Sequence, residues 1–382
     1  MGGSGMKKIN LKKANPAQAA GSETAEFKWM GKDTAAVLIA AVLTAAVRAG
    51  FEYMTGGDMD ALSPGFPALV AFFLTFFMLK HRFSFLPVDH GRQYAVQGMA
   101  SKGKLRGVGI IMVICFLVTS LVFVRFSFEY LIYAILIFIE MMSGYLDDAS
   151  SSAWQDYKKG AIDLGVSLLT GIVFVVTNST NTYIGKVQIT LHPVVYVVLA
   201  AVLVWASINA TNCVDGVDGL CGSLSIITIL SIALIYMSDL NQSYFEYSLI
   251  MAGVLLAYLI FNTKPSSMLM GDAGSRAIGV LIAILIMKSG HPLSYLVLAI
   301  VMIVDGLTGL VKVFFKRFFH ISFFRTLKTP LHDEMRRDLL TGEDTTPKPK
   351  KPRVRNWQDP QIVARFCIIQ TAASVLWYAL GL

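Results

Sequence analysis

Charged residues are scarce in this sequence. Asp, Glu, Lys and Arg make up 15% of its 382 residues, whereas a soluble globular domain carries about 25%. Lipid hydrocarbon offers no hydrogen-bond partners, so each crossing segment must satisfy its own backbone as a helix or in a closed barrel. Together with long uncharged stretches, the scarcity argues against a soluble enzyme and predicts an all-α, polytopic transmembrane protein.

Cysteines are few, and internal repeats are missing. The four cysteines are Cys115, Cys213, Cys221 and Cys367. They form no CxxC pair and no Cys/His spacing of a zinc site, which argues against a disulfide framework or a zinc centre. Many secondary transporters carry inverted repeats, so their absence from the sequence argues against that class.

What the sequence has instead is a series of apolar segments. A helix needs about 20 apolar residues to cross the hydrocarbon core. The segments lie at residues 34–52, 65–79, 107–124, 129–146, 162–178, 193–208, 219–237, 245–261, 277–287, 293–315 and 362–381. They predict ten or eleven spans. Residues 1–33 are expected to be a cloning remnant and a basic cytoplasmic tail, and residues 34–382 a single integral-membrane domain.

The basic residues predict the orientation of the spans. The net charge is +8, but Lys and Arg concentrate in alternate loops, which indicates membrane topology rather than nucleic-acid binding. The basic side is therefore predicted to be cytoplasmic and the C-terminus external. Some of the basic loop residues, including Lys102 and Lys159, are expected to bind an anionic substrate. The loops on this side are 80–106, 147–161, 209–218, 262–276 and 316–361.

Two adjacent carboxylates, Asp147 and Asp148, follow the apolar segment 129–146. Neighbouring carboxylates repel each other and are costly to bury at a membrane boundary. A divalent cation or a proton-transfer role would justify the pair. Two solvated carboxylates that mark a helix end are the alternative.

A short stretch between two apolar segments carries many functional groups. Its candidate substrate-binding residues are Asn209, Asn212, Asp215 and Asp218. Asparagine can pair a donor and an acceptor with a base edge, and the glycines of this stretch let the backbone approach a ligand. A polar turn with an Asp cap is the alternative, but such a turn needs fewer functional groups.

Asp272 is a third acidic position on the same face, just before the segment 277–287. Mg²⁺ prefers carboxylate and phosphate oxygens. Asp147, Asp148 and Asp272 could therefore hold Mg²⁺ on a diphosphate, although a helix cap is again the alternative. His332, in the last loop, is a further candidate, but a lone histidine near a membrane surface is more often structural than catalytic.

These motifs, in this order and on one face, resemble the polyprenyl-phosphate N-acetylhexosamine-1-phosphate transferase superfamily. Within it, the segment WQDPQIVARF at 357–366 and the loop LPVDHGR at 86–92 are similar to the phospho-N-acetylmuramoyl-pentapeptide transferases, also called translocase I. The resemblance covers residues 65–382. It implies a bacterial inner-membrane α-helical fold of ten spans, a cytoplasmic active site and Mg²⁺ as cofactor.

The reaction that the resemblance implies begins the membrane stage of peptidoglycan synthesis. Phospho-MurNAc-pentapeptide passes from UDP-MurNAc-pentapeptide to undecaprenyl phosphate, which gives lipid I and UMP. The implied partners are these two substrates and the bilayer, without nucleic acid, and a homodimer is left open. The alternatives are a transferase that uses UDP-GlcNAc or another UDP-HexNAc and, from another class, a secondary transporter with intramembrane carboxylates.

The motif matches imply roles for single residues. The catalytic set is Asp147, Asp148, Asp272 and His332. The metal ligands are Asp272 and Asp148. The substrate-binding set is Asn209, Asn212, Asp215, Asp218, Asn262, Lys102 and Lys159.

The sequence also departs from the family at several positions. Asp333 and Glu334 replace the second and third of three consecutive histidines, and we expect them to pair with Arg336 and Arg337, so that His332 alone faces the substrate. The other departures are Ser150–Ser152 in place of a lysine, Lys104–Gly109 in place of Thr-Pro-Thr-Met-Gly-Gly, and Leu269 in place of an aromatic residue.

Overall fold

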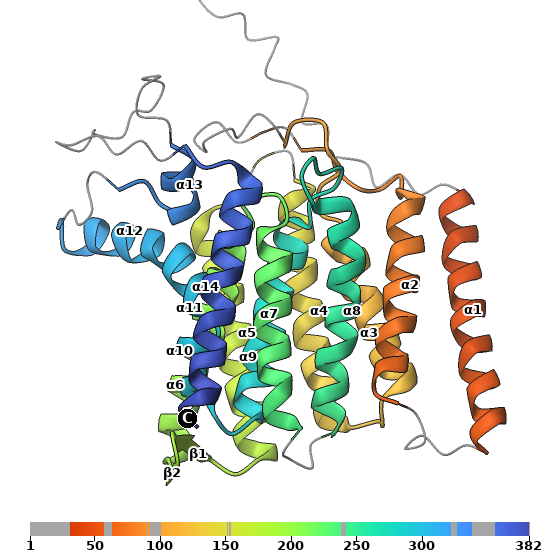
Figure 1. Ribbon diagram of the computed structural model, residues 1–382, viewed down its shortest axis with the longest axis horizontal. Coiled ribbons are helices and arrows are strands. Elements are labelled where there is room, and N and C mark those ends of the chain that lie inside the picture. Colours follow the sequence, from red (N-terminus) through yellow and green to blue (C-terminus); the bar gives the residue numbers. More distant parts are fainter. Residues whose placement is uncertain are drawn as a thin grey trace, which may run out of the picture.

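The protein is a bundle of helices that run side by side, with a small hairpin at one end (Figure 1). The computed structural model describes residues 31–56, 63–89, 91, 101–150, 152, 154–237, 242–321, 327–337 and 356–381. The long helices are α1 (Gly31–Thr55), α2 (Gly65–His81), α3 (Gly109–Phe123), α4 (Phe128–Asp148), α5 (Asp156–Thr177), α6 (Pro193–Val214), α7 (Leu220–Tyr236), α8 (Gln242–Asn262), α9 (Gly271–Lys288) and α14 (Asp359–Ala379).

The remaining elements are short or bent. Strands β1 (Asn181–Ile184) and β2 (Val187–Thr190) form the antiparallel hairpin. Between α9 and α14 lie η4 (Pro292–Ser294), α10 (Tyr295–Leu298), α11 (Ile300–Met302), the π-helical η5 (Ile303–Leu307), α12 (Thr308–Phe318) and α13 (Leu331–Arg336).

Helix α9 forms the centre of the bundle. Every residue from Ala273 to Met287 is buried, and α9 packs against both α4 and α6. A helix that is apolar on all sides needs neighbours on all sides, so its sequence suits this position. The apolar core continues from α9 into α3, α4, α7 and α8.

The helices begin where local sequence favours it. Ser127 caps α4, since its side chain accepts a hydrogen bond from the backbone N–H of Tyr130. Pro193 opens α6, where its missing N–H costs nothing. Gln358 and Gln361 form a reciprocal capping box at the start of α14.

Each predicted apolar segment lies on helical structure, but several predicted boundaries are wrong, and α5 and α9 each begin six residues earlier than expected, at Asp156 and Gly271. The loop expected from residue 209 is helical up to Val214, because α6 continues six residues further than expected. The segment 293–315 is not one straight helix, since the chain bends by 73° between Leu298 and Ile300. Helix α12, beyond the bend, runs sideways from the bundle (Figure 1).

Length and composition support a multi-pass helical membrane protein. Among the described residues, six helices are long and apolar enough to cross a membrane, and the bent pair would make a seventh. The six are α1, α4, α5, α6, α8 and α14, while α2, α3 and α7 are shorter apolar helices. The total of ten or eleven spans stays a prediction, as does the single domain over residues 34–382.

The polar loops gather at one end of the bundle. The ends of α4 and α6 and the starts of α5, α9 and α14 lie there, while the hairpin and the end of α14 lie at the other (Figure 1). The described parts of the chemically interesting loops share this end, and the assignment of this end to the cytoplasm stays a prediction. Of the predicted tail, the structure describes only residues 31–33, which begin α1.

Candidate active site

Three helices meet closely at the polar end because two glycines leave no side chain between them. A Cβ atom on Gly144 of α4 would overlap the backbone of Asp272 at the start of α9. A Cβ atom on Gly109 of α3 would overlap the backbone of Gly274, also on α9. Only glycine permits such contact between backbones, so these positions bring the ends of α3 and α4 onto α9.

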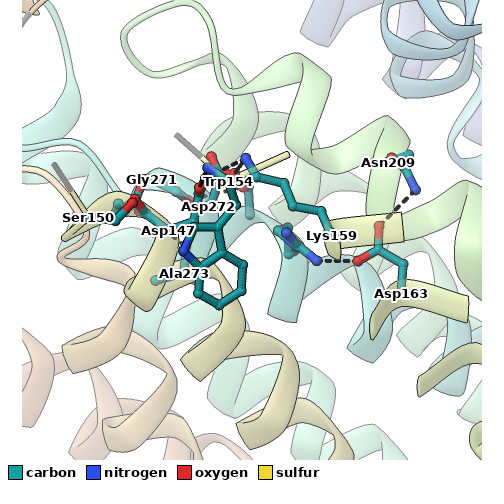
Figure 2. Close-up of polar contacts among 12 residues, drawn as sticks. Asp147, Ser150, Trp154, Lys159, Asp163, Asn209, Gly271, Asp272 and Ala273 are labelled. Atoms are coloured by element: carbon teal, nitrogen blue, oxygen red, sulfur yellow. Dashed lines mark hydrogen bonds and ion pairs between the residues drawn. The ribbon is translucent and has the colours of Figure 1, made fainter. Parts of the chain in front are cut away.

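Lys159, in the first turn of α5, lies between two of the predicted catalytic carboxylates. Its ammonium contacts Asp147 at the end of α4 and lies 3.3 Å from Oδ2 of Asp272. The backbone N–H of Trp154 donates to Oδ1 of Asp147 at 2.7 Å. The three charged side chains point toward one another in Figure 2. We call Asp147, Lys159 and Asp272 the surface ion cluster.

Arg106 connects this cluster to Asp148. Its Nε lies 2.8 Å from Oδ1 of Asp148, and its Nη2 lies 3.5 Å from Oδ1 of Asp272. Its Nη1 lies 3.2 Å from Oδ1 of Asp89. Burial alone would lower the pKa of Arg106, but the carboxylates around it, Asp148 foremost, raise that pKa above its ordinary value. The guanidinium therefore stays charged.

The backbone around Arg106 is tied to two other loops. The N–H of Arg106 donates to the carbonyl of Pro87 at 2.9 Å, and the carbonyl of Leu105 accepts from the N–H of Leu269 at 2.8 Å. Single β-bridges join Leu105 to Val88 and to Met268. Sequence reasoning counted Arg106 only among the basic loop residues, because nothing local shows that three loops meet there.

Asp218 and Asn262 hold the loop after α6. Asp218 accepts from Lys104, whose Nζ lies 3.1 Å from Oδ2, and from the backbone N–H of Ser266 at 3.4 Å. Asn262 is buried; its Oδ1 accepts from Gly219 at 2.8 Å, and its Nδ2 donates to Met268 at 2.8 Å. Asn262 therefore positions this loop through both the oxygen and the nitrogen of its side-chain amide, and its contact with substrate stays a prediction.

The structure separates the other residues predicted to bind substrate. Asp215 directly follows α6 and lies near enough to Arg106 to raise the pKa of Arg106. Asn212 is half-buried on the last turn of α6. Asn209 lies deeper, where its Nδ2 donates to the carbonyl of Trp205 at 2.9 Å and lies 3.4 Å from Oδ2 of Asp163.

His332 is buried and held by a residue that sequence reasoning missed. Its backbone N–H and its Nδ1 contact the two carboxylate oxygens of Asp305, each at 2.7 Å. Asp305 lies in η5, after the bend, and is itself fully buried. An acidic residue inside a long apolar segment is a functional candidate by default, so Asp305 carried a signal within 293–315. The imidazole also packs against Gly216, after α6.

The carboxylates beside His332 pair with arginines, as predicted. Oδ1 of Asp333 lies 3.8 Å from Nη1 of Arg336, and Oε2 of Glu334 lies 3.4 Å from Nη1 of Arg337. Arg336 also contacts Asp359, the first residue of α14, at 2.7 Å. Oδ1 of Asp333 lies 4.0 Å from Nε2 of His332. The acids are therefore neutralised locally.

Two carboxylates suit the expected Mg²⁺, although they do not make a complete metal site. In the described ranges, no three His, Cys, Asp or Glu side chains gather closely enough to hold a metal ion. Mg²⁺ is usually held by one or two carboxylates together with substrate phosphates and water. Asp148 and Asp272 supply hard oxygens beside the same guanidinium, and Oδ1 of Asp148 is buried with no aligned hydrogen bond. The donor set fits Mg²⁺.

Lys102 is exposed on the loop before Arg106 and lies outside the ion network described above. Several residues noted in the sequence lie outside the described part of the chain. They are His90 and Arg92 of the early loop, Ser151 after the carboxylate pair and the basic run 348–355.

Comparison with known proteins places the chain in a family. The profile of glycosyl transferase family 4 matches residues 130–290. A phospho-N-acetylmuramoyl-pentapeptide-transferase of Treponema pallidum is 34% identical over 331 residues, which is 81% of this chain and 87% of the relative.

A protein of the same name from Dictyoglomus turgidum is 28% identical over 310 residues, or 80% of this chain and 94% of that relative. Another from a Wolbachia of Brugia malayi is 26% identical over 285 residues, or 71% and 82%. These matches cover more of the chain than the profile does. The chain belongs to the phospho-N-acetylmuramoyl-pentapeptide-transferase family.

Proposed function

We propose that the protein transfers phospho-MurNAc-pentapeptide from UDP-MurNAc-pentapeptide to undecaprenyl phosphate, giving lipid I and UMP. One observation carries the proposal. Asp147, Asp148 and Asp272 converge with Arg106 and Lys159 from separate parts of the chain. Family membership and this matched set of charges together favour a phosphosugar transferase over a carrier.

The reaction exchanges one phosphoanhydride bond for another. An oxygen of the lipid phosphate bonds to the β-phosphorus of the UDP-sugar, and the bond from that phosphorus to the bridging oxygen breaks. UMP leaves with the bridging oxygen. Such transfers are catalysed mainly by positioning and by neutralising charge on the phosphates.

The residues at the polar end supply both functions. Arg106 and Lys159 are assigned to the diphosphate, because each already contacts more than one anionic oxygen. Asp147 is assigned to the lipid phosphate, which it orients. Phosphate has a second pKa of about 6, so a strong base is not required near neutral pH. Asp148 and Asp272 would hold Mg²⁺, which would offset the charge that builds on the leaving group.

The loop after α6 is assigned to the nucleoside, and His332 to a phosphate or sugar oxygen. Asp215 and Asp218 belong to this loop, Asn212 lies on the last turn of α6 before it, and the imidazole packs against Gly216 of the loop. The contact between Asp305 and Nδ1 fixes the ring orientation and places Nε2 next to Gly216 of this loop.

We place the protein in the bacterial inner membrane, with ten or eleven spans, the polar end in the cytoplasm and the C-terminus outside. The support is the concentration of Lys and Arg in loops at the polar end. UDP-MurNAc-pentapeptide then reaches the site from the cytosol, and undecaprenyl phosphate reaches it from the bilayer.

A comparison of sugar donors tests the proposal. Purified protein in lipid nanodiscs with undecaprenyl phosphate is supplied with UDP-MurNAc-pentapeptide or UDP-GlcNAc, and released UMP is measured with and without Mg²⁺. We expect Mg²⁺-dependent release with the first donor only. Release with UDP-GlcNAc alone would move the proposal to another transferase of the superfamily, and no release with either would return the transporter alternative.

A further inference from the structure

A second cluster of charges lies deeper in the bundle, directly below the surface ion cluster. Arg276 of α9 contacts Glu140 of α4, with Nε 2.8 Å from Oε1, and also contacts Asp163 of α5. All three are buried: Glu140 is 0%, Arg276 2% and Asp163 5% exposed. We call Glu140, Asp163 and Arg276 the buried ion cluster.

The buried ion cluster joins the same three helices as the surface ion cluster. In each, one cation lies between carboxylates of the two other helices: Lys159 of α5 above, and Arg276 of α9 below. On α5 and on α9 the two charged residues are four positions apart, and on α4 they are seven apart. These spacings return to the same helix face after one and two turns. Figure 2 shows Asp163 beside Lys159, with Asn209 pointing toward it.

Stability alone is a weak reason for such a cluster. Removing three charges from water is costly, and apolar residues of similar size often replace buried ion pairs without loss of stability. Oε2 of Glu140 is even left buried with no hydrogen bond. No proposed catalytic contact uses these residues.

Geometry gives a better reason. Each residue of a helix rises by about 1.5 Å, so a slide of one residue between α5 and α9 would break the contact of Arg276 with Asp163. The same slide would separate Lys159 from Asp272, one turn above. The side chain of Asn209 adds a link from α6 to Asp163.

We propose that Arg276 is a positioning residue: through Asp163 and Glu140 it sets the axial offset of α4, α5 and α9 at which Lys159 bridges Asp147 and Asp272. This proposal rests on the proposed function for its catalytic consequence. Loss of the cluster should lower kcat more than it changes KM, because misplaced charges affect the transition state more than substrate binding.

The chain offers a matched control on two of the same helices. Lys288, at the end of α9, contacts Glu129, in the first turn of α4, with Nζ 3.0 Å from Oε2. This ion pair lies at the opposite end of both helices from the surface ion cluster. Like the buried ion cluster, it joins α4 to α9, but it does not lie next to the surface ion cluster.

The experiment compares two neutralised forms in nanodiscs. The triple variant Glu140→Gln/Asp163→Asn/Arg276→Met removes the buried ion cluster without leaving a bare charge, and Glu129→Gln/Lys288→Met is the control. We expect the triple variant to lose about 10- to 100-fold in kcat, the scale of a misplacement near 1 Å, with KM for the sugar donor within about three-fold. The control should keep wild-type kcat.

A double-mutant cycle identifies the route of the effect. If Arg276 acts through Lys159, the triple change should cost little further kcat in a Lys159→Met background, because coupled residues are not additive. Arg276→Lys, which keeps the charge, should retain more kcat than the triple variant. Additive losses, an equal loss in the control, or wild-type kcat in the triple variant would each overturn the proposal.

Hydrogen–deuterium exchange gives a readout that needs no turnover. The backbone amides at the starts of α5 and α9 should exchange faster in the triple variant than in wild type, and unchanged in the control. Unchanged exchange in the triple variant contradicts the positioning role even if the wild type releases no UMP. If the wild type releases no UMP but the triple variant still exchanges faster, the proposed function is contradicted and the positioning role is not.

Discussion

Single residues at the polar end are arranged as alternating acids and bases. Arg106 contacts three carboxylates, and Lys159 contacts two. Without these cations, Asp147, Asp148 and Asp272 would repel one another at a membrane boundary. The same cations match the charge of a diphosphate, so the arrangement both stabilises the folded loops and prepares a site for an anionic substrate.

Asp272→Asn keeps the shape of the side chain and removes its charge. We expect turnover to fall at least about 100-fold, the scale of losing a main electrostatic stabiliser, with a larger loss at limiting Mg²⁺. UMP release by the purified variant measures this. Asp156→Asn, an exposed carboxylate at the start of α5, is the control, and near wild-type turnover of Asp272→Asn would show that the carboxylate is not a metal ligand.

His332→Ala and Asp305→Asn should both cut turnover strongly. The first change removes the imidazole, and the second weakens the contact that orients it. Asp333→Asn and Glu334→Gln should lower the melting temperature, since each leaves a buried arginine with a weaker partner. Their turnover should stay near wild type. The opposite ranking in a UMP-release assay would assign the carboxylates, not the histidine, to the site.

The acids at the end of α4 and the start of α9 and the cation Lys159 could be predicted from the sequence, whereas Arg106 and Asp305 could not. Asp147, Asp148 and Asp272 stand out because charge is rare next to long apolar segments. Arg106 looked like an ordinary basic loop residue, since its position depends on backbone hydrogen bonds to loops far away in the sequence. Asp305 was overlooked inside an apolar segment that was treated as one span.

At the scale of helices, close packing positions the site. The starts and ends of α3, α4 and α9 approach one another only because Gly109 and Gly144 lack a side chain. Asp147 and Asp148 end α4, and Asp272 begins α9. The separation of the acidic groups is therefore set by contact between helix backbones rather than by a flexible loop.

Gly144→Ala places a methyl group against the backbone of Asp272. Overpacking typically costs about 1–3 kcal/mol, so we expect a lower melting temperature and a clear loss of turnover. The control is Gly165→Ala on α5, where an added Cβ meets nothing within 4 Å; it should be neutral or stabilising. Equal behaviour of the two variants would contradict close packing of α4 on α9.

The sequence predicted which segments are helical more reliably than where those helices end or bend. Apolar length predicted a helix at every expected segment, because lipid and core both demand buried backbone hydrogen bonds. It did not show that α6 continues through Asn212, since a polar helical turn and a polar loop have similar compositions. Nor did it show the bend near Ala299, on either side of which α10 and α11 contact α14.

At the scale of the whole molecule, the polar groups of the two ends differ. One end carries the ion pairs of Arg106 and Lys159. The other end carries the hairpin and the end of α14 (Figure 1). A transferase that joins a cytosolic donor to a lipid acceptor needs its charged groups at one membrane surface. The concentration of the candidate residues at one end agrees with that requirement.

Cysteine labelling tests the orientation. Tyr157→Cys lies exposed near the start of α5, and Val187→Cys lies exposed on the hairpin. In intact bacterial cells whose outer membrane has been permeabilised, an impermeant maleimide should label Val187→Cys and leave Tyr157→Cys unlabelled. Inverted vesicles should give the reverse, and the opposite pattern would place the site outside.

The stoichiometry of the products tests the central claim most directly. Wild-type protein in nanodiscs receives UDP-MurNAc-pentapeptide and undecaprenyl phosphate, and mass spectrometry counts UMP and the lipid-linked diphosphate sugar over time. We predict equal amounts of both, neither without the lipid phosphate, and both lost together in Asp272→Asn. UMP formed without lipid phosphate, or a lipid product without UMP, would contradict transfer of the phosphosugar at this site.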